Sequence, residues 1–478
     1  MNRINRKNGM RAVVCAMALL LGGCASMAPD YVQPALSVAS VIGAGEHAEN
    51  AGGSGDGAQE LPALQWEQVF VDARLRQVIE QAVAHNRDLR VSLLNVEKAQ
   101  AQYRIQSADL FPSIAATASQ TAARSAVSDT SGGMRGQASR SAGLSVGFTS
   151  WELDLFGRVR SLKNEALESY LSLEETGRSA RISLIAEVAS GWLTVGAYQQ
   201  RLALAQETLA SQRKTLELTR NKRAFGVASA VDVSQVETSV ESARVDAAGY
   251  ATALEQARHA LDLLVGSHVG EDLLPSMAND GSEGVALAAL PDSIASTTLL
   301  KRPDVLAAEH ALKAANADIG AARAAFFPKV SLSVSAGRGS DSLSNLFDVG
   351  TRTWSFIPNV SLPIFNAGAL KASLDMAEIQ KNIQIAQYEK SIQSAFSEVA
   401  DAMSVRSHIG EQLDAQHALV KASQTSYELS DARYRNGVNS YLQALDAQRS
   451  LYGARQSLIT LQLSDAVSRV NLYKVLGG

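Results

Sequence analysis

The sequence predicts an α+β membrane protein built from two copies of one unit, each a pair of β-strands followed by a long helical hairpin. Apolar side chains recur every seven residues in long stretches without proline, which is typical of helices that pack along one seam. Shorter stretches alternate between apolar and small polar residues, which indicates strands with one apolar face. Two motifs of the first half return in the second half, which indicates an internal repeat.

The repeat is visible at two places in the chain. The segment 223–231 matches 434–442 at a constant offset of 211 residues, and both segments contain a Gly-Val pair. Upstream, the segment 110–114 matches 326–330 at an offset of 216. The expected organisation is a first structural repeat over residues 67–265, an inter-repeat linker over 266–300 and a second structural repeat over 301–478.

The N-terminus carries two sorting features. Basic residues precede a short apolar run, Ala12–Leu21, so residues 1–23 are predicted to be a signal peptide. The run ends in Leu21-Gly22-Gly23-Cys24, which resembles a bacterial lipobox, where the cysteine is acylated. The alternative is an ordinary signal peptide with an incidental cysteine. Residues 24–66 form a Pro- and Gly-rich segment that we expect to be extended rather than folded by itself.

Composition argues against several functions. The formal net charge of −4 becomes −8 when the four basic residues of the signal peptide are removed, which argues against a nucleic-acid partner. Cys15 lies in the removed run, so the mature chain keeps one cysteine and has no internal disulfide. The 7 histidines form no metal-type pair, and neither G-x-S-x-G nor a phosphate-binding glycine loop occurs. We therefore expect neither an enzyme nor a metal site.

The first repeat is expected to open with a helical pattern over Trp66–Leu110. Phe111-Pro112 ends it, because proline lacks a backbone donor and restricts the residue before it. A strand pair is expected within residues 113–153, where apolar and small polar residues alternate. The polar, Gly- and Ser-rich stretch Thr121–Gly143 is expected to be the loop between these strands.

The second repeat has a strand pair within residues 329–363, separated by a loop over Arg338–Arg352. Pro358 has no donor for a ladder, so we expect a bulge or a strand end there. Strands of about ten residues with one apolar face suit a transmembrane barrel, and the alternative is a soluble two-layer core. The sorting signal favours the barrel. Because four strands cannot close a pore and open edges are not tolerated in lipid, several chains must contribute strands.

Each strand pair is followed by a very long helix. These helices are expected over Arg158–Lys222 and Ala369–Arg433, and each is roughly 100 Å long at 1.5 Å per residue. They are rich in alanine, and their polar positions are spread around the circumference, which suits a hollow wall of helices. Gly437 is expected to end a helix in the left-handed conformation, and Ser440 to cap the next one. The hairpin tips are expected at 223–232 and 434–446.

Seven segments together are long and specific. They are Cys24 with Pro29–Pro34, Trp151–Arg158, Arg302-Pro303-Asp304, Ala321–Pro328, Leu362–Phe365, Leu445–Ser450 and Asn471–Gly478. In these segments the chain resembles the TolC-like outer-membrane efflux factors, in the lipoprotein (NodT/OprM-type) group that serves resistance–nodulation–division pumps. The resemblance covers essentially the whole mature chain. It implies the outer-membrane-efflux-protein fold, a homotrimeric twelve-stranded β-barrel with four strands per chain, continued by a long periplasmic α-helical barrel.

The resemblance also implies a function. The chain would be the outer-membrane channel of a tripartite multidrug efflux pump, a passive exit duct for drugs and other small molecules. Its partners would be a periplasmic adaptor, an inner-membrane resistance–nodulation–division pump and outer-membrane lipid, with diacylglycerol and an N-acyl chain on Cys24. The adaptor would dock at the tip residues Gly226, Val227, Asp232, Gly437 and Val438.

The resemblance places the channel gate on the second hairpin tip, at Tyr434, Leu442 and Asp446. Leu442 and Asp446 are four residues apart and share one helix face. Taken singly, each is more often ordinary seam packing or a solvated charge. Two other functions stay open: the outer-membrane duct of a heavy-metal cation efflux system, and a lipid-anchored periplasmic coiled-coil scaffold. The scaffold would explain the helices and Cys24 but not the duplicated strand pairs.

Overall fold

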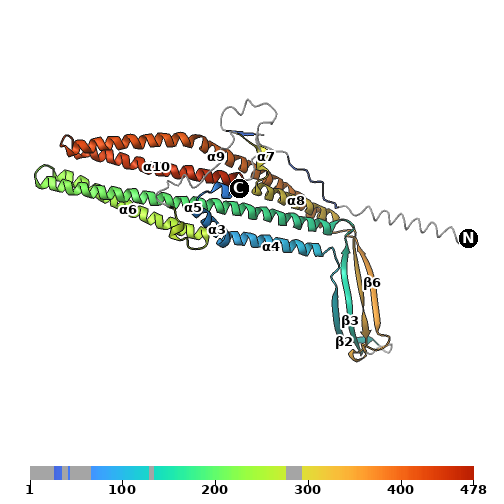
Figure 1. Cartoon of the computed structure of the whole chain (residues 1–478). Coiled ribbons are helices and arrows are strands. Elements are labelled where there is room, and N and C mark those ends of the chain that lie inside the picture. The colour runs from blue at the N-terminus through green and yellow to red at the C-terminus, as the bar shows by residue number, and fades with distance from the viewer. Residues whose placement is uncertain (1–25, 35–40, 44–65, 129–133, 276–292) are drawn as a thin grey trace. The chain divides into compact units, whose positions relative to one another are not determined.

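The computed structural model describes residues 26–34, 41–43, 66–128, 134–275 and 293–478 (Figure 1). The predicted signal peptide, Cys24, most of the segment 24–66 and most of the inter-repeat linker lie outside the described residues. The chain divides into two compact units, and both units combine segments of the two sequence repeats. Unit 1 contains Met1–Ala35, Asn95–Leu173 and Ala307–Tyr388, and unit 2 contains Leu36–Leu94, Glu174–Leu306 and Glu389–Gly478.

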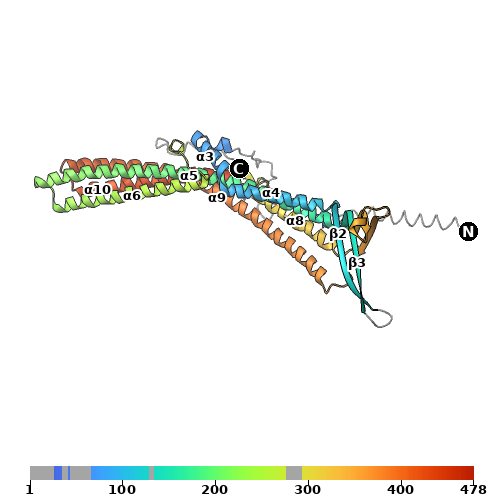
Figure 2. The ribbon, with the colours of Figure 1, turned by 90° about the horizontal axis from the view of Figure 1, so that it is seen from below.

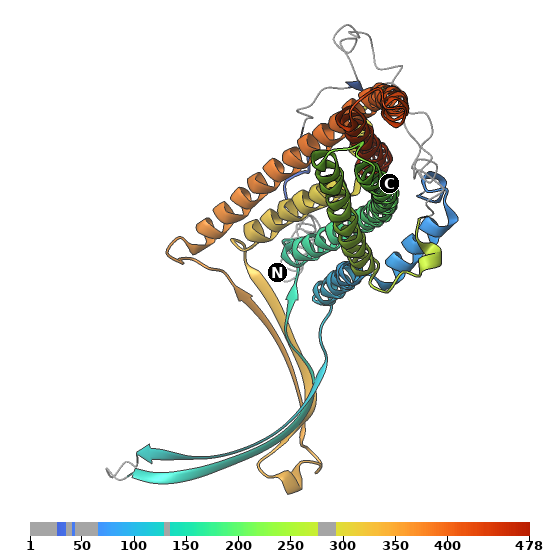
Figure 3. The same ribbon diagram turned by 90° about the vertical axis from the view of Figure 1, so that its left-hand side faces the viewer.

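Unit 1 holds one antiparallel sheet of four strands in the order β2-β3-β5-β6. The strands are β2 (Ala115–Ser128), β3 (Met134–Leu153), β5 (Lys329–Ser340) and β6 (Arg352–Ser361), with a short 3₁₀ turn η5 (Leu343–Asn345) before β6. The strand pairs of the two repeats meet where β3 pairs with β5. Figure 3 shows that the strands curve along their length. The outer edges of β2 and β6 have no partner strand within the described residues.

The predicted loop over Thr121–Gly143 is wrong. β2 continues to Ser128 and β3 begins at Met134, so most of this stretch is paired strand. The composition misled the prediction because small polar residues are typical of loops, whereas those of 121–128 and 134–143 pair with residues of the neighbouring strand. The first strand pair is therefore longer than the expected ten residues, with 14 residues in β2 and 20 in β3.

The irregularity expected at Pro358 lies in another strand. Pro358 pairs in register with Leu332, and β6 is the outer strand of this chain's sheet, where a missing donor is tolerated. The register shifts instead in β3, between Phe148 and Trp151. Ser150 takes a positive φ of 56° there, and its backbone N–H donates to Ser333 Oγ at 2.8 Å. A bulge of this kind bends a strand and increases its twist.

Unit 1 also contains the ends of four helices that flank the sheet. These helices are α4 (Arg87–Ala108), α5 (Arg158–Ala224), α8 (Pro303–Ala324) and α9 (Ala369–Arg435). α5 begins where Asp154 accepts hydrogen bonds from the backbone N–H groups of Val159 and Arg160, at 3.2 and 3.0 Å. Both long helices have 67 residues, which confirms the lengths expected from the absence of proline.

Unit 2 is helical and contains the two hairpins, α5 with α6 (Ala230–Val265) and α9 with α10 (Tyr441–Val475). The shorter elements of this unit are α2 (Trp66–Val69), α3 (Ala73–His85), η3 (Glu271–Leu273), α7 (Ser296–Leu299) and the strand pair β1 (Val41–Gly43) with β4 (Ser293–Ala295). Figure 2 shows the two hairpins running alongside each other. Their shared core includes Phe70, Ile79, Trp192, Leu261 and Tyr473.

The helical pattern predicted over Trp66–Leu110 is broken into three helices. The break between α3 and α4 is at Asn86, which is buried. Its side-chain amide donates to the carbonyl oxygen of Leu264 at 2.7 Å, and its side-chain oxygen accepts from the backbone N–H of Leu89 at 2.7 Å. Asn86 is therefore the C-cap of α3, and its side chain caps the start of α4 and ties it to α6. Along the part of the chain that the structure describes, no helix is both long enough and apolar enough to cross a bilayer.

Candidate functional site

The first hairpin tip joins α5 to α6. Gly226 takes a left-handed φ of 75°, and the backbone N–H of Val227 donates to the carbonyl oxygen of Lys222 at 2.9 Å, so the last turn of α5 is closed. Ser229 and Asp232 form a reciprocal capping box at the start of α6. Phe225 is 84% exposed. The first tip therefore presents apolar side chains on a backbone that is capped on both sides.

The second hairpin tip joins α9 to α10 by the same turn. Gly437 has a φ of 74°, as predicted, and the backbone N–H of Val438 donates to the carbonyl oxygen of Arg433 at 2.9 Å. Ser440 occupies the predicted N-cap position, but its side chain makes no capping hydrogen bond. The residue three positions later is Gln443, whose side chain accepts a hydrogen bond from Asn439 instead.

Two buried tyrosines connect the second tip to the neighbouring helix α5. Tyr434 is 9% exposed and Tyr441 is 3% exposed, and their rings meet edge to face with centroids 5.3 Å apart. The hydroxyl of Tyr434 lies 3.3 Å from Thr219 Oγ1, and Lys222 Nζ lies 4.1 Å from the centre of the Tyr434 ring. Tyr441 Oη donates to Gln212 Oε1 at 3.1 Å. Both rings therefore contact α5 as well as their own hairpin.

The three predicted gate residues are placed differently. Leu442 is 47% exposed and Asp446 is exposed, one turn apart on α10. Tyr434 is buried in its own chain by the contacts just described. Leu442 and Asp446 are therefore free to face an opening, whereas Tyr434 is not exposed within this chain.

A row of polar side chains on α10 contacts the first hairpin, and the sequence reasoning missed it. Gln212 Nε2 donates to Gln448 Oε1 at 2.6 Å, and Tyr452 Oη donates to Asp246 Oδ2 at 3.2 Å. One turn further, Gln456 Nε2 donates to Tyr250 Oη at 2.8 Å. The signal was present as a spacing of four residues between the three α10 partners, which places them on one face.

The sheet of unit 1 has two chemically different faces. Cross-strand partners share a face, so Phe148, Val334 and Phe356, which pair in sequence across β3, β5 and β6, lie on the same side. The further apolar side chains on this side are Leu144, Val146, Trp151, Leu153, Val330, Leu332, Trp354 and Val360. The opposite side carries mainly hydroxyls and glycines, and Ser335 Oγ lies 2.8 Å from Ser355 Oγ across it. The alternation predicted from the sequence is confirmed.

Histidines and carboxylates do not gather in the described ranges: no three His, Cys, Asp or Glu side chains are placed to share a metal ion there. Two of the histidines pair with a carboxylate, His310 with Glu168 at 2.7 Å and His268 with Asp262 at 2.8 Å. Two carboxyls of unit 1 are unusual. Burial, and for Glu165 also the nearby Asp318, raises the pKa of Glu165 and of Asp318 above their ordinary values.

Comparison with known proteins gives one family. Residues 78–267 and 294–478 match the family described as "Outer membrane efflux protein". The chain is 46% identical over 461 residues to the "Antibiotic efflux pump outer membrane protein ArpC" of Pseudomonas putida. It has the same identity to the "Toluene efflux pump outer membrane protein TtgC" of that organism. Each alignment covers 96% of this chain and 94% of the relative.

A solved structure agrees with the sequence matches. The fold is similar to the open state of the Neisseria gonorrhoeae MtrE outer membrane channel, with a TM-score of 0.83 and 38% sequence identity. This similarity covers 95% of this chain and 98% of that one. The similarity therefore includes both the four-stranded sheet and the long helices.

Proposed function

The chain belongs to the outer membrane efflux protein family, and we propose that it is the passive exit duct of a tripartite pump for antibiotics and organic solvents. The fold class, the outer-membrane location and the role as a channel of an efflux pump are as the sequence predicted. The observation that carries the proposal is the sheet: four antiparallel strands with one apolar face, one hydroxyl-lined face and two outer edges without a partner strand in the described chain.

Trimer formation completes this sheet. Backbone groups at an open edge are not tolerated in lipid, so β6 of one chain pairs with β2 of the next, and three chains close a barrel of twelve strands. The apolar face then meets lipid and the hydroxyl-lined face meets water. A passive duct of this kind catalyses no reaction that could drive transport. The energy for export is therefore supplied by a resistance–nodulation–division pump in the inner membrane.

The exposed pair on the second tip supports a gate. Under threefold symmetry, Leu442 and Asp446 each become a ring of three side chains. Three leucines can plug a narrow opening, and three carboxylates on one axis repel one another and attract cations. Tyr434 takes a supporting role in this proposal, because its contacts with Thr219 and Lys222 hold the tip from which the gate projects.

The first tip supports docking of a periplasmic adaptor. Gly226, Val227 and Asp232 form a rigid turn with exposed apolar side chains, which is the chemistry of a protein-binding surface. Gly437 and Val438 present the same turn on the second hairpin. The adaptor therefore binds two similar tips on each chain, and the first tip, with its capping box, is the more rigid of the two.

Lipid on Cys24 would add a second anchor. The sequence around this residue resembles a lipobox, and several acyl chains hold a protein on a membrane far more firmly than one. Metabolic labelling with palmitate tests this directly. We expect label on the wild-type protein and none on Cys24→Ser, and label that persists on the serine variant contradicts the assignment.

The two relatives named for antibiotic and toluene pumps favour organic substrates over the metal-cation alternative. The test is complementation in a bacterial strain that lacks its outer-membrane efflux component but keeps the adaptor and the pump. The wild-type chain should restore resistance to antibiotics and toluene, and trimers in planar bilayers should conduct ions without any nucleotide. Resistance restored to metal cations alone would support the alternative, and absence of conductance would contradict the channel.

A further inference from the structure

Four arginines lie on the apolar face of the sheet, near the hairpin turns. We call Arg124, Arg140, Arg338 and Arg352 the arginine belt. Arg338 pairs directly with Arg352 and with Leu144, so all three share the face of Val334. In the β2–β3 register, Arg124 pairs with Ala138 and Arg140 with Ala122, at positions of the same parity as Leu144.

Among the described residues, no carboxylate pairs with the positive charges of the arginine belt. Arg124, Arg140 and Arg352 are exposed, and no belt residue forms an ion pair with any residue that the structure describes. Arg338 is half-buried, and its Nη1 donates to the carbonyl oxygen of Phe347 at 2.8 Å. Unpaired guanidinium groups on an otherwise apolar surface are costly in hydrocarbon, so they must lie where a polar partner exists.

The position of the belt along the strands is regular. Arg124 lies eight residues after Ala116, Arg338 eight after Val330, and Arg352 eight before Val360. Eight residues of a strand tilted by ~40° rise about 20 Å, close to the ~25 Å apolar band of outer-membrane barrels. The belt therefore lies at one rim of the lipid-facing band, where lipid headgroups begin.

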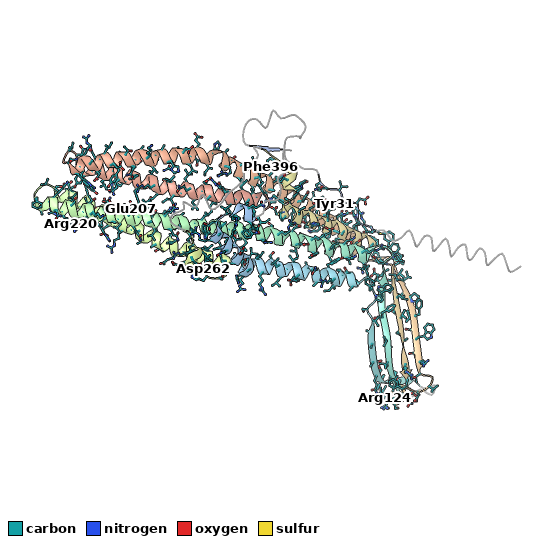
Figure 4. The ribbon with its side chains drawn as sticks, viewed as in Figure 1. Tyr31, Arg124, Glu207, Arg220, Asp262 and Phe396 are labelled. Atoms are coloured by element: carbon teal, nitrogen blue, oxygen red, sulfur yellow. The ribbon has the colours of Figure 1, made fainter. Side chains whose placement is uncertain are left out.

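The two rims of the sheet differ in chemistry. At the ends that join the helices, exposed apolar side chains surround the strands, among them Phe111, Ile114, Ile364 and Phe365. The hairpin ends carry the arginine belt beside the exposed apolar residues Leu343, Phe347 and Val349 of the β5–β6 loop, and Figure 4 shows Arg124 there. In a channel whose helices lie in the periplasm, the hairpin ends reach the outer leaflet.

We propose that the arginine belt binds the phosphate groups of anionic outer-leaflet lipids and so sets the depth of the trimer in the membrane. The inference rests on the proposed orientation of the apolar face toward lipid. Guanidinium groups bind phosphate by paired, charge-assisted hydrogen bonds. A basic residue near an anionic membrane surface strengthens binding severalfold, and each belt position occurs three times in a trimer. Steering of anions through the channel is a different role, and it would require arginines on the hydroxyl-lined face.

Purified trimers in phosphatidylcholine vesicles with and without bis-phosphorylated lipid A test the proposal. Native mass spectrometry should show lipid A retained by the wild-type trimer. The triple variant Arg124→Gln, Arg140→Gln, Arg352→Gln should bind on the order of tenfold less. Arg338 is kept because it holds the loop before β6. Equal retention by the wild-type and triple-variant trimers overturns the proposal.

Matched controls separate position from charge. Arg213→Gln removes an exposed arginine from helix α5 and should leave lipid binding unchanged. In the Arg124→Gln, Arg140→Gln background, the exchange Arg352→Thr with Thr353→Arg keeps the charge but moves it to the other face of β6, and it should bind lipid A as weakly as the triple variant. Binding equal to that of the Arg124→Gln, Arg140→Gln double variant contradicts the assignment to the lipid-facing side.

The phosphate itself is tested last. The wild-type trimer should retain dephosphorylated lipid A only as weakly as the triple variant retains lipid A itself. Inorganic phosphate that competes at the same concentration as lipid A would overturn the assignment to lipid. Single-channel conductance of the triple variant should match the wild type. A wild-type trimer that fails to conduct refutes the channel function, whereas loss of lipid A binding alone bears only on the belt.

Discussion

The two hairpin tips have the same turn but are stabilised differently. The first tip is stabilised locally by the capping box of Ser229 and Asp232 at the start of α6, and Phe225 extends into solvent. The second tip has no side-chain cap at Ser440. It is stabilised instead by Tyr434 and Tyr441, whose hydroxyls contact α5. The duplication preserved the turn, because only a left-handed glycine fits it, and changed the residues that support it.

This difference suits the two tips to different roles. A tip with a locally capped backbone keeps its shape when its neighbours move, which suits docking. A tip that depends on contacts with another helix is released when those contacts break, which suits a gate. The polar row formed by Gln448, Tyr452 and Gln456 extends the dependence of the second hairpin on the first one.

The largest effect is expected from removing the support of the second tip. Tyr441→Ala deletes a buried ring and should cost about 3 kcal/mol locally. Hydrogen exchange at the amides of 434–446 should rise accordingly. The matched change Phe225→Ala at the exposed first tip should alter exchange at 223–232 by less than about 0.5 kcal/mol. Similar losses at both tips would mean that the two tips are supported in the same way.

The second-largest effect is expected at the proposed gate. Leu442→Ala with Asp446→Ala should raise single-channel conductance severalfold and make cells sensitive to large antibiotics such as vancomycin, because the plug and the charge ring are both removed. The equivalent residues of the first tip are Val231 and Gln235. Alanine at both of these positions should leave conductance unchanged. If the first-tip pair opens the channel as much as the second-tip pair, the constriction is shared by both hairpins.

Capping should distinguish the tips by a smaller amount. Ser229→Ala removes a side chain that accepts from the backbone N–H of Asp232 and should weaken the start of α6 by ~1 kcal/mol. Ser440→Ala removes no capping hydrogen bond and should have almost no effect. Exchange rates of the first-turn amides of α6 and α10 measure both changes. A larger loss at Ser440 would contradict the assigned difference in caps.

Alkaline pH should loosen only the second tip. Burial raises the pKa of Tyr441 above its ordinary value, so the folded tip favours the neutral phenol. This stabilisation is complete below the unfolded pKa of ~10 and is lost as the pH rises through the higher folded value. Protection of the amides of 434–446, measured against their intrinsic exchange rates, should therefore fall above pH ~10. The first tip should keep its protection, because Arg223 and Ala230 occupy the positions equivalent to Tyr434 and Tyr441. Tyr441→Phe should remove this contribution and leave only that of Tyr427, whose pKa burial also raises.

The sequence alone was sufficient for the features that depend on local patterns. Alternation of apolar and small residues predicted the strands, because each side of a strand meets a uniform environment. The absence of proline predicted two helices of 67 residues to within a few residues. Gly226 and Gly437 marked the tips, because a left-handed turn needs glycine. The long family motifs, such as Trp151–Arg158, identified the channel family.

Other features required the tertiary structure. Strand pairing of residues 121–128 with 134–141 depends on hydrogen bonds to the neighbouring strand, and a composition of small polar residues does not predict it. The bulge lies between Phe148 and Trp151 rather than at Pro358, because an outer strand tolerates a missing donor. Tyr434 is buried because α5 lies beside it, and no spacing within α9 encodes that neighbour. Contacts between segments far apart in the chain therefore determined what local patterns left open.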